Sequence, residues 1–228
     1  MSDLVLSYAR IRAEPRSSSD RARRVLNVVV ALIAIVVSAP VMVVVAVLVR
    51  VDSGGPIIYR QKRVGLDRRG GGGGRTDARR SMDLGGRIFT IYKFRTMTHG
   101  SDAGECWAAT DDRRVTRVGR VLRATRLDEL PQLVNVLKGD MNIVGPRPEQ
   151  PKIFAELRRE VSGYRQRQRV LPGITGWAQI NQGYDTSIDD VKKKVELDLE
   201  YIERRSAAKD LLIMAKTMPV MVMRKGGM

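Results

Sequence analysis

One stretch of the sequence constrains the fold more than any other. Residues 25–49 carry no charged side chain and read VLNVVVALIAIVVSAPVMVVVAVLV, between Arg24 and Arg50. At about 1.5 Å of rise per residue, such a helix is roughly 37 Å long, enough for a hydrocarbon core of about 30 Å. The run is too long and too far from the N-terminus for the core of a signal peptide, and no small-residue cleavage pattern follows it. Residues 25–50 are therefore predicted to form a membrane helix.

Two features bear on whether this helix crosses the membrane. Basic residues flank both ends of the run, and the positive-inside rule would keep both ends in the cytoplasm. The basic residues before the run are Arg10, Arg12, Arg16, Arg21, Arg23 and Arg24, and those after it are Arg50, Arg60, Lys62 and Arg63. Near the middle lies Ser38-Ala39-Pro40, where proline removes a backbone donor and clashes with the preceding turn. A broken, re-entrant helix that returns to the same face satisfies both observations. The residues favour it only slightly over a single span, because proline is tolerated in spanning helices.

Charge and composition narrow the chemistry. The 228 residues contain 41 Lys and Arg against 25 Asp and Glu, a net charge of +16, so the expected partner is a polyanion: nucleic acid, a phosphorylated substrate or an anionic membrane face. The single cysteine, Cys106, cannot form an intrachain disulfide, and with the single histidine, His99, it provides no ligand set for zinc. Any chemistry must rely on carboxylates, Lys and Arg, and a hard metal ion.

The rest of the chain is predicted to be an α+β domain, mainly helical. Residues 1–24 are expected to form a basic arm, and residues 51–228 one polar domain. Two predicted strands, 57–64 and 87–97, form a short β-hairpin around the Gly/Arg-rich segment 66–86, which is expected to be a flexible loop. The glycine run at 70–74 lacks the GK[ST] ending of a P-loop.

Apolar spacing and capping residues predict the helices that follow. The expected helical segments are 115–124, 129–138, 149–168, a helix capped by Ser187, and 206–223. The first is amphipathic and basic, and the last is apolar but interrupted, which is typical of helices that lie in a membrane interface.

Asp128-Glu129 is the pair most suited to catalysis. Asp128 stands where the 129–138 helix should begin, so a helix N-cap is the simpler interpretation and, on spacing alone, stays ahead. Adjacent carboxylates also suit phosphate chemistry, because one can attack phosphorus while the other holds a divalent cation. Four cations are candidates to neutralise phosphate charge in the folded chain: Lys93, Arg95, Arg126 and Arg147.

Two stiff turns and two further acids complete the candidates. Gly145-Pro146-Arg147-Pro148 is either a plain loop or an anion clamp that fixes one guanidinium. Residues 172–179 form a second stiff turn that carries Trp177, for which a buried core position is expected. Asp198 and Asp210 lie on predicted helices, where solvated or capping carboxylates are the default expectation.

Together these motifs resemble the bacterial sugar transferase family, the small monotopic phosphoglycosyl transferases. The resemblance runs from about Arg24 to the C-terminus. It is carried by Ser38-Ala39-Pro40, IYRQKRVG (58–65), IYKFRTM (91–97), LDELPQLVNVLKGDMNIVGPRP (127–148) and PGITGWAQIN (172–181). Several separate blocks in the right order make the match highly specific.

The resemblance implies a reaction and a location. Such enzymes rest on the cytoplasmic face of the bacterial inner membrane through a re-entrant helix, next to an anionic leaflet. They transfer a sugar 1-phosphate from a UDP-sugar to undecaprenyl phosphate, release UMP and use Mg²⁺, which starts the assembly of an exopolysaccharide, a capsule or another surface glycan. The implied covalent nucleophile is Asp128, and Glu129 is the implied metal ligand. The expected substrate-binding residues are Lys93, Arg95, Arg126, Arg147, Pro146 and Pro148.

The sequence departs from the family pattern in one block. Many members have Asn-Gly-Arg after Gly-Trp-Ala-Gln, whereas this chain reads Asn181-Gln182-Gly183-Tyr184. Candidates to replace the missing arginine are Arg165, Arg167 and Arg169.

Two other classes of function are compatible with parts of the sequence. The charge of +16 also suits a membrane-tethered nucleic-acid-binding protein, but aromatic residues make up only 5% of the chain and no DNA- or RNA-binding motif is present, so no nucleic-acid partner is expected. An inactive scaffold is disfavoured by the intact Asp128, Glu129 and Arg147. The sugar and the oligomeric state, a homo-oligomer included, stay open.

Overall fold

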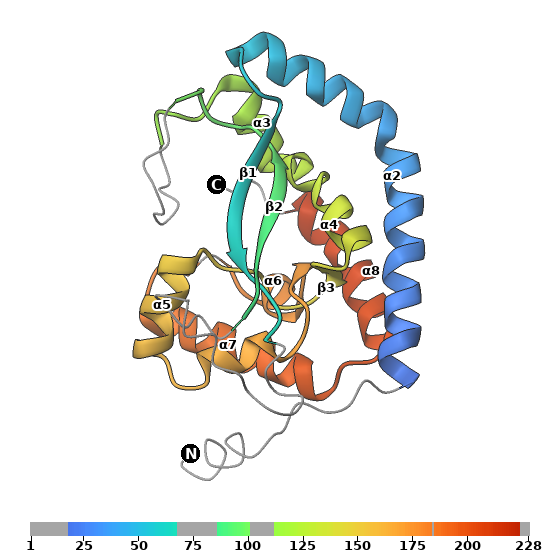
Figure 1. Ribbon diagram of the computed structural model, residues 1–228, viewed down its shortest axis with the longest axis vertical. Helices are drawn as coiled ribbons and strands as arrows, with labels where there is room; N and C mark the ends of the chain where they lie inside the picture. Colours follow the sequence, from blue (N-terminus) through green and yellow to red (C-terminus); the bar gives the residue numbers. More distant parts are fainter. Residues whose placement is uncertain (1–17, 68–85, 101–111, 184, 224–228) are drawn as a thin grey trace.

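The structure is a computed structural model that describes residues 18–67, 86–100, 112–183 and 185–223 (Figure 1). The predicted arm before residue 18, most of the 66–86 loop and Cys106 lie outside the described residues. The described chain is mostly helical with a short antiparallel hairpin, as the sequence predicts.

The N-terminal helix α2 (Ser18–Ser53) is continuous through Pro40. It begins before the apolar run, so residues 18–24 of the predicted arm are helical. The expected break at Ser38-Ala39-Pro40 is therefore absent, although the helix axis bends along its length (Figure 1). Ser38 Oγ donates to the carbonyl of Ala34 at 2.6 Å, and Pro40 lacks the N–H that would continue the ladder; both features are known to bend helices without ending them.

One stripe of α2 packs on the rest of the protein along both halves of the helix. In its first half, Ala31 is buried against a cluster that includes Leu133 and Met141. In its second half, Val45 and Val49 are buried with Phe94 and Leu122. The other face exposes large apolar side chains: Val25, Val29, Leu32, Ile33, Val36, Val37, Val41, Val43, Val44, Val47, Leu48 and Val51. By length and composition α2 is able to cross a membrane, and this exposed apolar face indicates a membrane-associated protein.

The predicted hairpin is confirmed. β1 (Ile58–Val64) pairs antiparallel with β2 (Ile88–Phe94), in a register that places Tyr59 opposite Lys93. β2 ends before the predicted limit of residue 97, where Met97 forms only an isolated bridge with Val115. A second, parallel pair, β3 (Asn142–Val144) and β4 (Gly173–Thr175), was not predicted, because strands of three residues leave no alternating pattern in the sequence.

The predicted helices occur in order with shifted ends, together with two short elements that were not predicted, Leu127–Glu129 and Trp177–Asn181. They are α3 (Arg117–Thr125), the 3₁₀ turn η2 (Leu127–Glu129), α4 (Gln132–Lys138), α5 (Pro151–Glu160), the 3₁₀ helix η3 (Tyr164–Arg169), α6 (Trp177–Asn181), α7 (Ile188–Glu203) and α8 (Ala207–Met223). Ser187 caps α7 through a capping box with Asp190, as expected. The predicted 149–168 helix is instead divided, because Val161 is extended and Gly163 adopts a left-handed φ of 77°.

The main core lies between α5, η3, α7 and α8. The predicted apolar faces of α5 and α7 are buried there: Ile153, Phe154, Leu157, Val161, Val191, Val195, Leu199 and Ile202. Trp177, which was expected inside this core, is only partly buried at its edge, where its Nε1 donates to Glu200 Oε2 at 3.0 Å. The core packs against β3, and the turn of residues 145–148 follows directly after this strand.

Candidate functional site

Asp128 and Glu129 lie in the short 3₁₀ turn between α3 and α4. Helix α4 begins only at Gln132, with Pro131 at its N-cap, so the N-cap interpretation of Asp128 is wrong. Arg126, the residue before the turn, has a left-handed φ of 60°, which lets the chain reverse at this point. Both carboxylates end up 7% exposed. Burial of two adjacent carboxylates is costly unless cations compensate for it.

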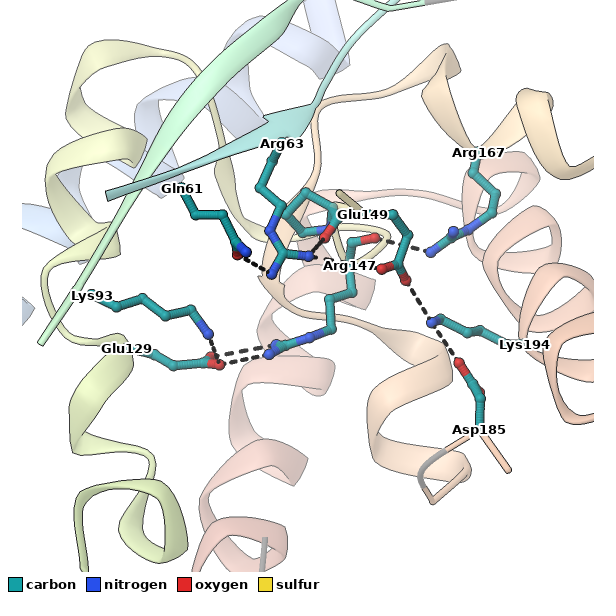
Figure 2. Close-up of polar contacts among 10 residues, drawn as sticks. Gln61, Arg63, Lys93, Glu129, Arg147, Glu149, Arg167, Asp185 and Lys194 are labelled. Carbon is teal, nitrogen blue, oxygen red and sulfur yellow. Dashed lines mark hydrogen bonds and ion pairs between the residues drawn. The ribbon is translucent and has the colours of Figure 1, made fainter. Parts of the chain in front are cut away.

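Glu129 receives that compensation from three cations. Its Oε1 lies 2.9 Å from Lys93 Nζ, 2.7 Å from Arg147 Nη2 and 3.8 Å from Arg126 Nη1. Lys93 comes from β2 and Arg147 from the turn after β3, and Figure 2 shows the two converging on Glu129. Of the residues that the sequence singled out, the structure thus brings together Lys93, Arg126, Arg147 and Glu129.

The pKa values of the two neighbouring carboxylates shift in opposite directions. Burial alone would raise the pKa of Glu129, but Arg147 and Lys93 outweigh it and hold that pKa well below its ordinary range. Burial raises the pKa of Asp128, and the adjacent Glu129 charge adds to the effect while Lys93 and Arg147 oppose it. Burial also lowers the pKa of Lys93. Glu129 is thus the strongly ionised member of the pair.

Asp128 differs from Glu129 in its hydrogen bonds as well. Its Oδ1 is buried, and among the described residues no donor reaches it. An unpaired carboxylate oxygen inside a protein is rare and costly. Beside three cations it is a free acceptor that can coordinate a metal or attack phosphorus.

Arg95 is placed elsewhere. Its guanidinium donates to Ser53 Oγ at 2.8 Å and to the carbonyl of Gly54, at the C-terminal end of α2. It is 6% exposed, and no carboxylate is paired with it in the described part of the chain. Burial, and then the charge of Arg50, lower its pKa. The structure does not join Arg95 to the group around Glu129.

The turn that carries Arg147 is fixed from behind. Pro146 and Pro148 are buried, the N–H of Gly145 donates to the carbonyl of Thr175 at 2.9 Å, and the N–H of Gly173 donates to the carbonyl of Pro146 at 3.0 Å. The unpredicted strand pair β3–β4 therefore supports the Pro-Arg-Pro turn.

Asp198 and Asp210 are not the solvated or capping carboxylates that were expected. Asp198 is 1% exposed and pairs with Arg167 Nε at 2.7 Å. Asp210 is fully buried and pairs with Arg23 Nε at 2.9 Å, while the hydroxyl of Tyr201 lies 2.7 Å from its Oδ1. Both carboxylates are buried because each meets an arginine from a different element.

A second group of charges, missed in the sequence, lies on the far side of Arg147. Lys194 Nζ bridges Glu149 Oε1 at 2.9 Å and Asp185 Oδ2 at 2.7 Å (Figure 2). Burial alone would raise the pKa of Glu149, but Lys194, Arg167 and Arg63 lower it to about 2. No motif marks these residues, and the only local signal is the position of Glu149 directly after the Pro-Arg-Pro turn.

Two of the three arginines proposed to replace the family's missing one, Arg165 and Arg167, have other partners. Arg165 is half exposed and pairs with Asp67 at 3.1 Å, and Arg167 is buried against Asp198. Neither pairs with Asp128 or Glu129 in the described structure.

The carboxylate pair is the candidate place for a metal ion. No group of three or more His, Cys, Asp or Glu side chains suited to a metal occurs within the described ranges. Mg²⁺, however, is commonly held by one or two carboxylates together with substrate phosphates. The free Oδ1 of Asp128 beside Glu129 fits a Mg²⁺ ion that binds together with a diphosphate.

Comparisons with known proteins show which proteins the chain is similar to. The family model described as bacterial sugar transferase matches residues 18–224. The chain is 43% identical over 196 residues to a UDP-N-acetylgalactosamine-undecaprenyl-phosphate N-acetylgalactosaminephosphotransferase of Aeromonas hydrophila. The matched region covers 86% of this chain and 42% of that protein. It is 39% identical over 198 residues to the UDP-glucose:undecaprenyl-phosphate glucose-1-phosphate transferase of Escherichia coli K12, covering 86% and 39%.

With a shorter relative, the match extends over more of the relative's length. The glucose-1-phosphate transferase of Caulobacter vibrioides, which bears the same name as the Escherichia coli protein, is 36% identical over 208 residues, covering 90% of this chain and 71% of the relative. The chain spans about two fifths of the length of the first two relatives.

Proposed function

The chain belongs to the bacterial sugar transferase family, and from this membership we propose that it transfers a sugar 1-phosphate from a UDP-sugar to undecaprenyl phosphate. The products are undecaprenyl-diphosphate-sugar and UMP, and the step starts the assembly of a surface glycan such as an exopolysaccharide or a capsule. The observation that carries the proposal is the buried Asp128-Glu129 pair, in which Glu129 is held by cations while Asp128 Oδ1 is left free.

The first half-reaction uses both carboxylates. The diphosphate of the donor binds against Lys93, Arg126 and Arg147, which already face Glu129. An oxygen of Asp128 attacks the sugar-bearing phosphorus, and the bond from that phosphorus to the oxygen of UMP breaks. UMP leaves with the electron pair, and a phosphosugar stays covalently attached to Asp128. Glu129 is the residue that would hold Mg²⁺, and the ion would supply charge neutralisation for the diphosphate.

The second half-reaction regenerates the carboxylate. A phosphate oxygen of undecaprenyl phosphate attacks the same phosphorus, and the bond to Asp128 breaks. The covalent intermediate lets a water-soluble donor and a lipid acceptor use one site in turn. The cations around Glu129 serve both steps, because each step develops negative charge on the transferred phosphoryl group.

The packing of α2 supports a monotopic, re-entrant arrangement at the cytoplasmic face of the inner membrane. Near one end of the helix, Arg23 pairs with Asp210, and near the other end Val49 packs with Phe94 and Leu122. Asp210, Phe94 and Leu122 all belong to the part of the chain that follows α2. A straight span would carry one end of α2 to the opposite face, away from them. The exposed apolar face would then lie in the hydrocarbon, with the flanking arginines at the anionic headgroups.

A purified, membrane-reconstituted protein tests the function. We expect UMP release from at least one UDP-sugar in a panel when undecaprenyl phosphate is present, and a labelled phosphosugar adduct on the protein when the acceptor is omitted. Asp128→Asn keeps the size of the side chain but removes the nucleophile, so it is expected to abolish both signals. An Asp128→Asn variant with normal turnover would exclude the proposed covalent mechanism, while absence of UMP release from every UDP-sugar would exclude the reaction itself.

A further inference from the structure

The Pro-Arg-Pro turn, residues 146–148, has few means to fix its own backbone. Two of its three residues are prolines, which lack a backbone N–H. The turn therefore offers mainly carbonyl acceptors, and buried carbonyls are almost always paired with a donor. The donors that reach these carbonyls must come from other elements, and they decide where Arg147 points.

Each of the three carbonyls has a donor from a different element. The carbonyl of Pro146 accepts from the backbone N–H of Gly173 on β4 at 3.0 Å. The carbonyl of Arg147 accepts from Arg167 Nη2 on η3 at 3.0 Å, and that of Pro148 accepts from Arg63 Nη1 on β1 at 3.0 Å. Two guanidinium groups thus hold two consecutive carbonyls, and Figure 2 shows both side chains reaching the turn.

Arg167 is itself held rigidly. It is 4% exposed, its Nε donates to Asp198 Oδ2 at 2.7 Å, and its guanidinium lies 4.8 Å from the centre of the Tyr164 ring. A planar guanidinium can donate to the carboxylate and to the carbonyl of Arg147 at once, whereas the single ammonium of lysine has no such fork. Because Arg167 is buried, its side chain does not reach a substrate directly.

Arg63 is fixed in a similar way. Its Nη2 donates to Gln61 Oε1 at 2.6 Å, and its Nη1 lies 3.8 Å from Glu149 Oε2. The same carboxylate binds Lys194 at 2.9 Å, so the charges behind the turn are connected. The orientation of Arg63 depends on this group rather than on solvent.

We propose that Arg63 and Arg167 are positioning residues that act through Arg147: by holding the carbonyls of Arg147 and Pro148, they direct the Arg147 guanidinium at Glu129 and at the diphosphate of the donor. The identity of that diphosphate rests on the function proposed above. Arg167 is therefore a support for the anion clamp and not a replacement for the family's missing arginine.

Lysine substitutions test the proposal while keeping the charge. Arg167→Lys and Arg63→Lys are each expected to lower kcat/KM for the UDP-sugar about tenfold, mainly through KM, because each loses one charge-assisted hydrogen bond to the turn. The matched controls are Arg165→Lys, on the same 3₁₀ helix but half exposed, and Arg60→Lys, exposed on the same strand as Arg63. Both controls are expected to retain wild-type kinetics. Normal kinetics in both Arg167→Lys and Arg63→Lys would overturn the proposal.

A double-mutant cycle separates positioning from a general loss of structure. In an Arg147→Ala background, Arg167→Lys is expected to cause no further loss of kcat/KM, because its effect passes through the missing side chain. Losses that multiply would show that Arg167 acts by another route and would overturn the proposal. If Arg167→Lys does not fold, as judged by its Tm, the same cycle with Arg63→Lys gives the answer from a different element.

A third measurement does not depend on turnover. Amide hydrogen exchange in peptides that cover residues 144–149 is expected to be faster in Arg167→Lys than in Arg165→Lys, because the turn loses a tether. Equal exchange in the two variants would overturn the positioning role. If the wild-type protein releases no UMP from any UDP-sugar, the proposed function fails, and this measurement still decides whether Arg167 orders the turn.

Discussion

Arg147 Nη2 lies 2.7 Å from Oε1 of Glu129, although 18 residues separate them in the sequence. Helix α4 and strand β3 lie between the two residues, so this contact joins the carboxylate pair to the Pro-Arg-Pro turn. The contact gives Glu129 a fixed orientation beside the free oxygen of Asp128. Four predictions follow from this site and from the charges and the membrane helix around it.

Replacement of Arg147 by lysine should impair donor binding although the positive charge is kept. Arg147 reaches both oxygens of Glu129, at 2.7 and 3.4 Å, and a lysine ammonium cannot reproduce this two-pronged contact. We expect KM for the UDP-sugar to rise by about ten- to a hundredfold, the equivalent of about 1.5–3 kcal/mol for a hydrogen bond to a charged group. Steady-state UMP release measures the effect, and an unchanged KM would place Arg147 outside the donor site.

Removing one partner of the buried ion pair of Arg23 and Asp210 should lower the stability of the fold. Asp210→Ala removes the nearer of two carboxylates beside the Arg23 guanidinium, which is 4% exposed, and leaves Asp20 at 3.7 Å. Removing one partner of a buried ion pair typically costs about 3–5 kcal/mol. The double variant Arg23→Met/Asp210→Leu is expected to be less destabilised than Asp210→Ala. Thermal unfolding in detergent measures both, and a double variant that is less stable than the single one would contradict this account.

Glu149 should make stability depend on pH in the acid range. Its pKa is lowered to about 2 in the folded state, against about 4.3 for an unfolded glutamate. The stabilisation is therefore complete above about pH 4.3 and is lost as the pH falls toward 2, with an upper limit of about 3 kcal/mol. We expect the Tm difference between wild type and Glu149→Gln to shrink on acidification from pH 7 to pH 3. A difference that is constant over this range would show that the carboxylate carries no such effect.

The re-entrant arrangement predicts that both ends of α2 label from the same side. In a Cys106→Ser background, cysteines at the exposed positions Ala22 and Asp52 are expected to resist a membrane-impermeant maleimide in intact spheroplasts and to react after permeabilisation. Reaction of only one of the two in intact spheroplasts would establish a single span.

Much of the site could be predicted because its residues sit in local motifs. Asp128, Glu129, Lys93, Arg126 and Arg147 were all identified from the sequence, and the structure brings the three cations to Glu129. Two details differ: Arg95 lies at the end of α2 instead, and the N-cap role of Asp128 is wrong, because a left-handed Arg126 inserts a 3₁₀ turn before α4. A helix start that depends on one backbone angle leaves no periodic signal.

The contacts that could not be predicted are those between distant parts of the chain. Asp210 meets Arg23 across 187 residues, and Asp198 meets Arg167 across 31, so composition and spacing gave only the default expectation of solvated carboxylates. The continuity of α2 is a similar case. A proline within an apolar run is compatible with a break or a bend, and the structure has a bend.

The stripe of α2 that packs on the domain makes the membrane helix part of the folding unit rather than a removable anchor. Phe89, Ile91, Phe94, Leu122 and Leu133 share their hydrophobic clusters with Ala31, Val45 and Val49. A fragment that begins at Val51 would present these side chains to water and is expected to aggregate. The described chain therefore completes its core only with α2 packed against the domain.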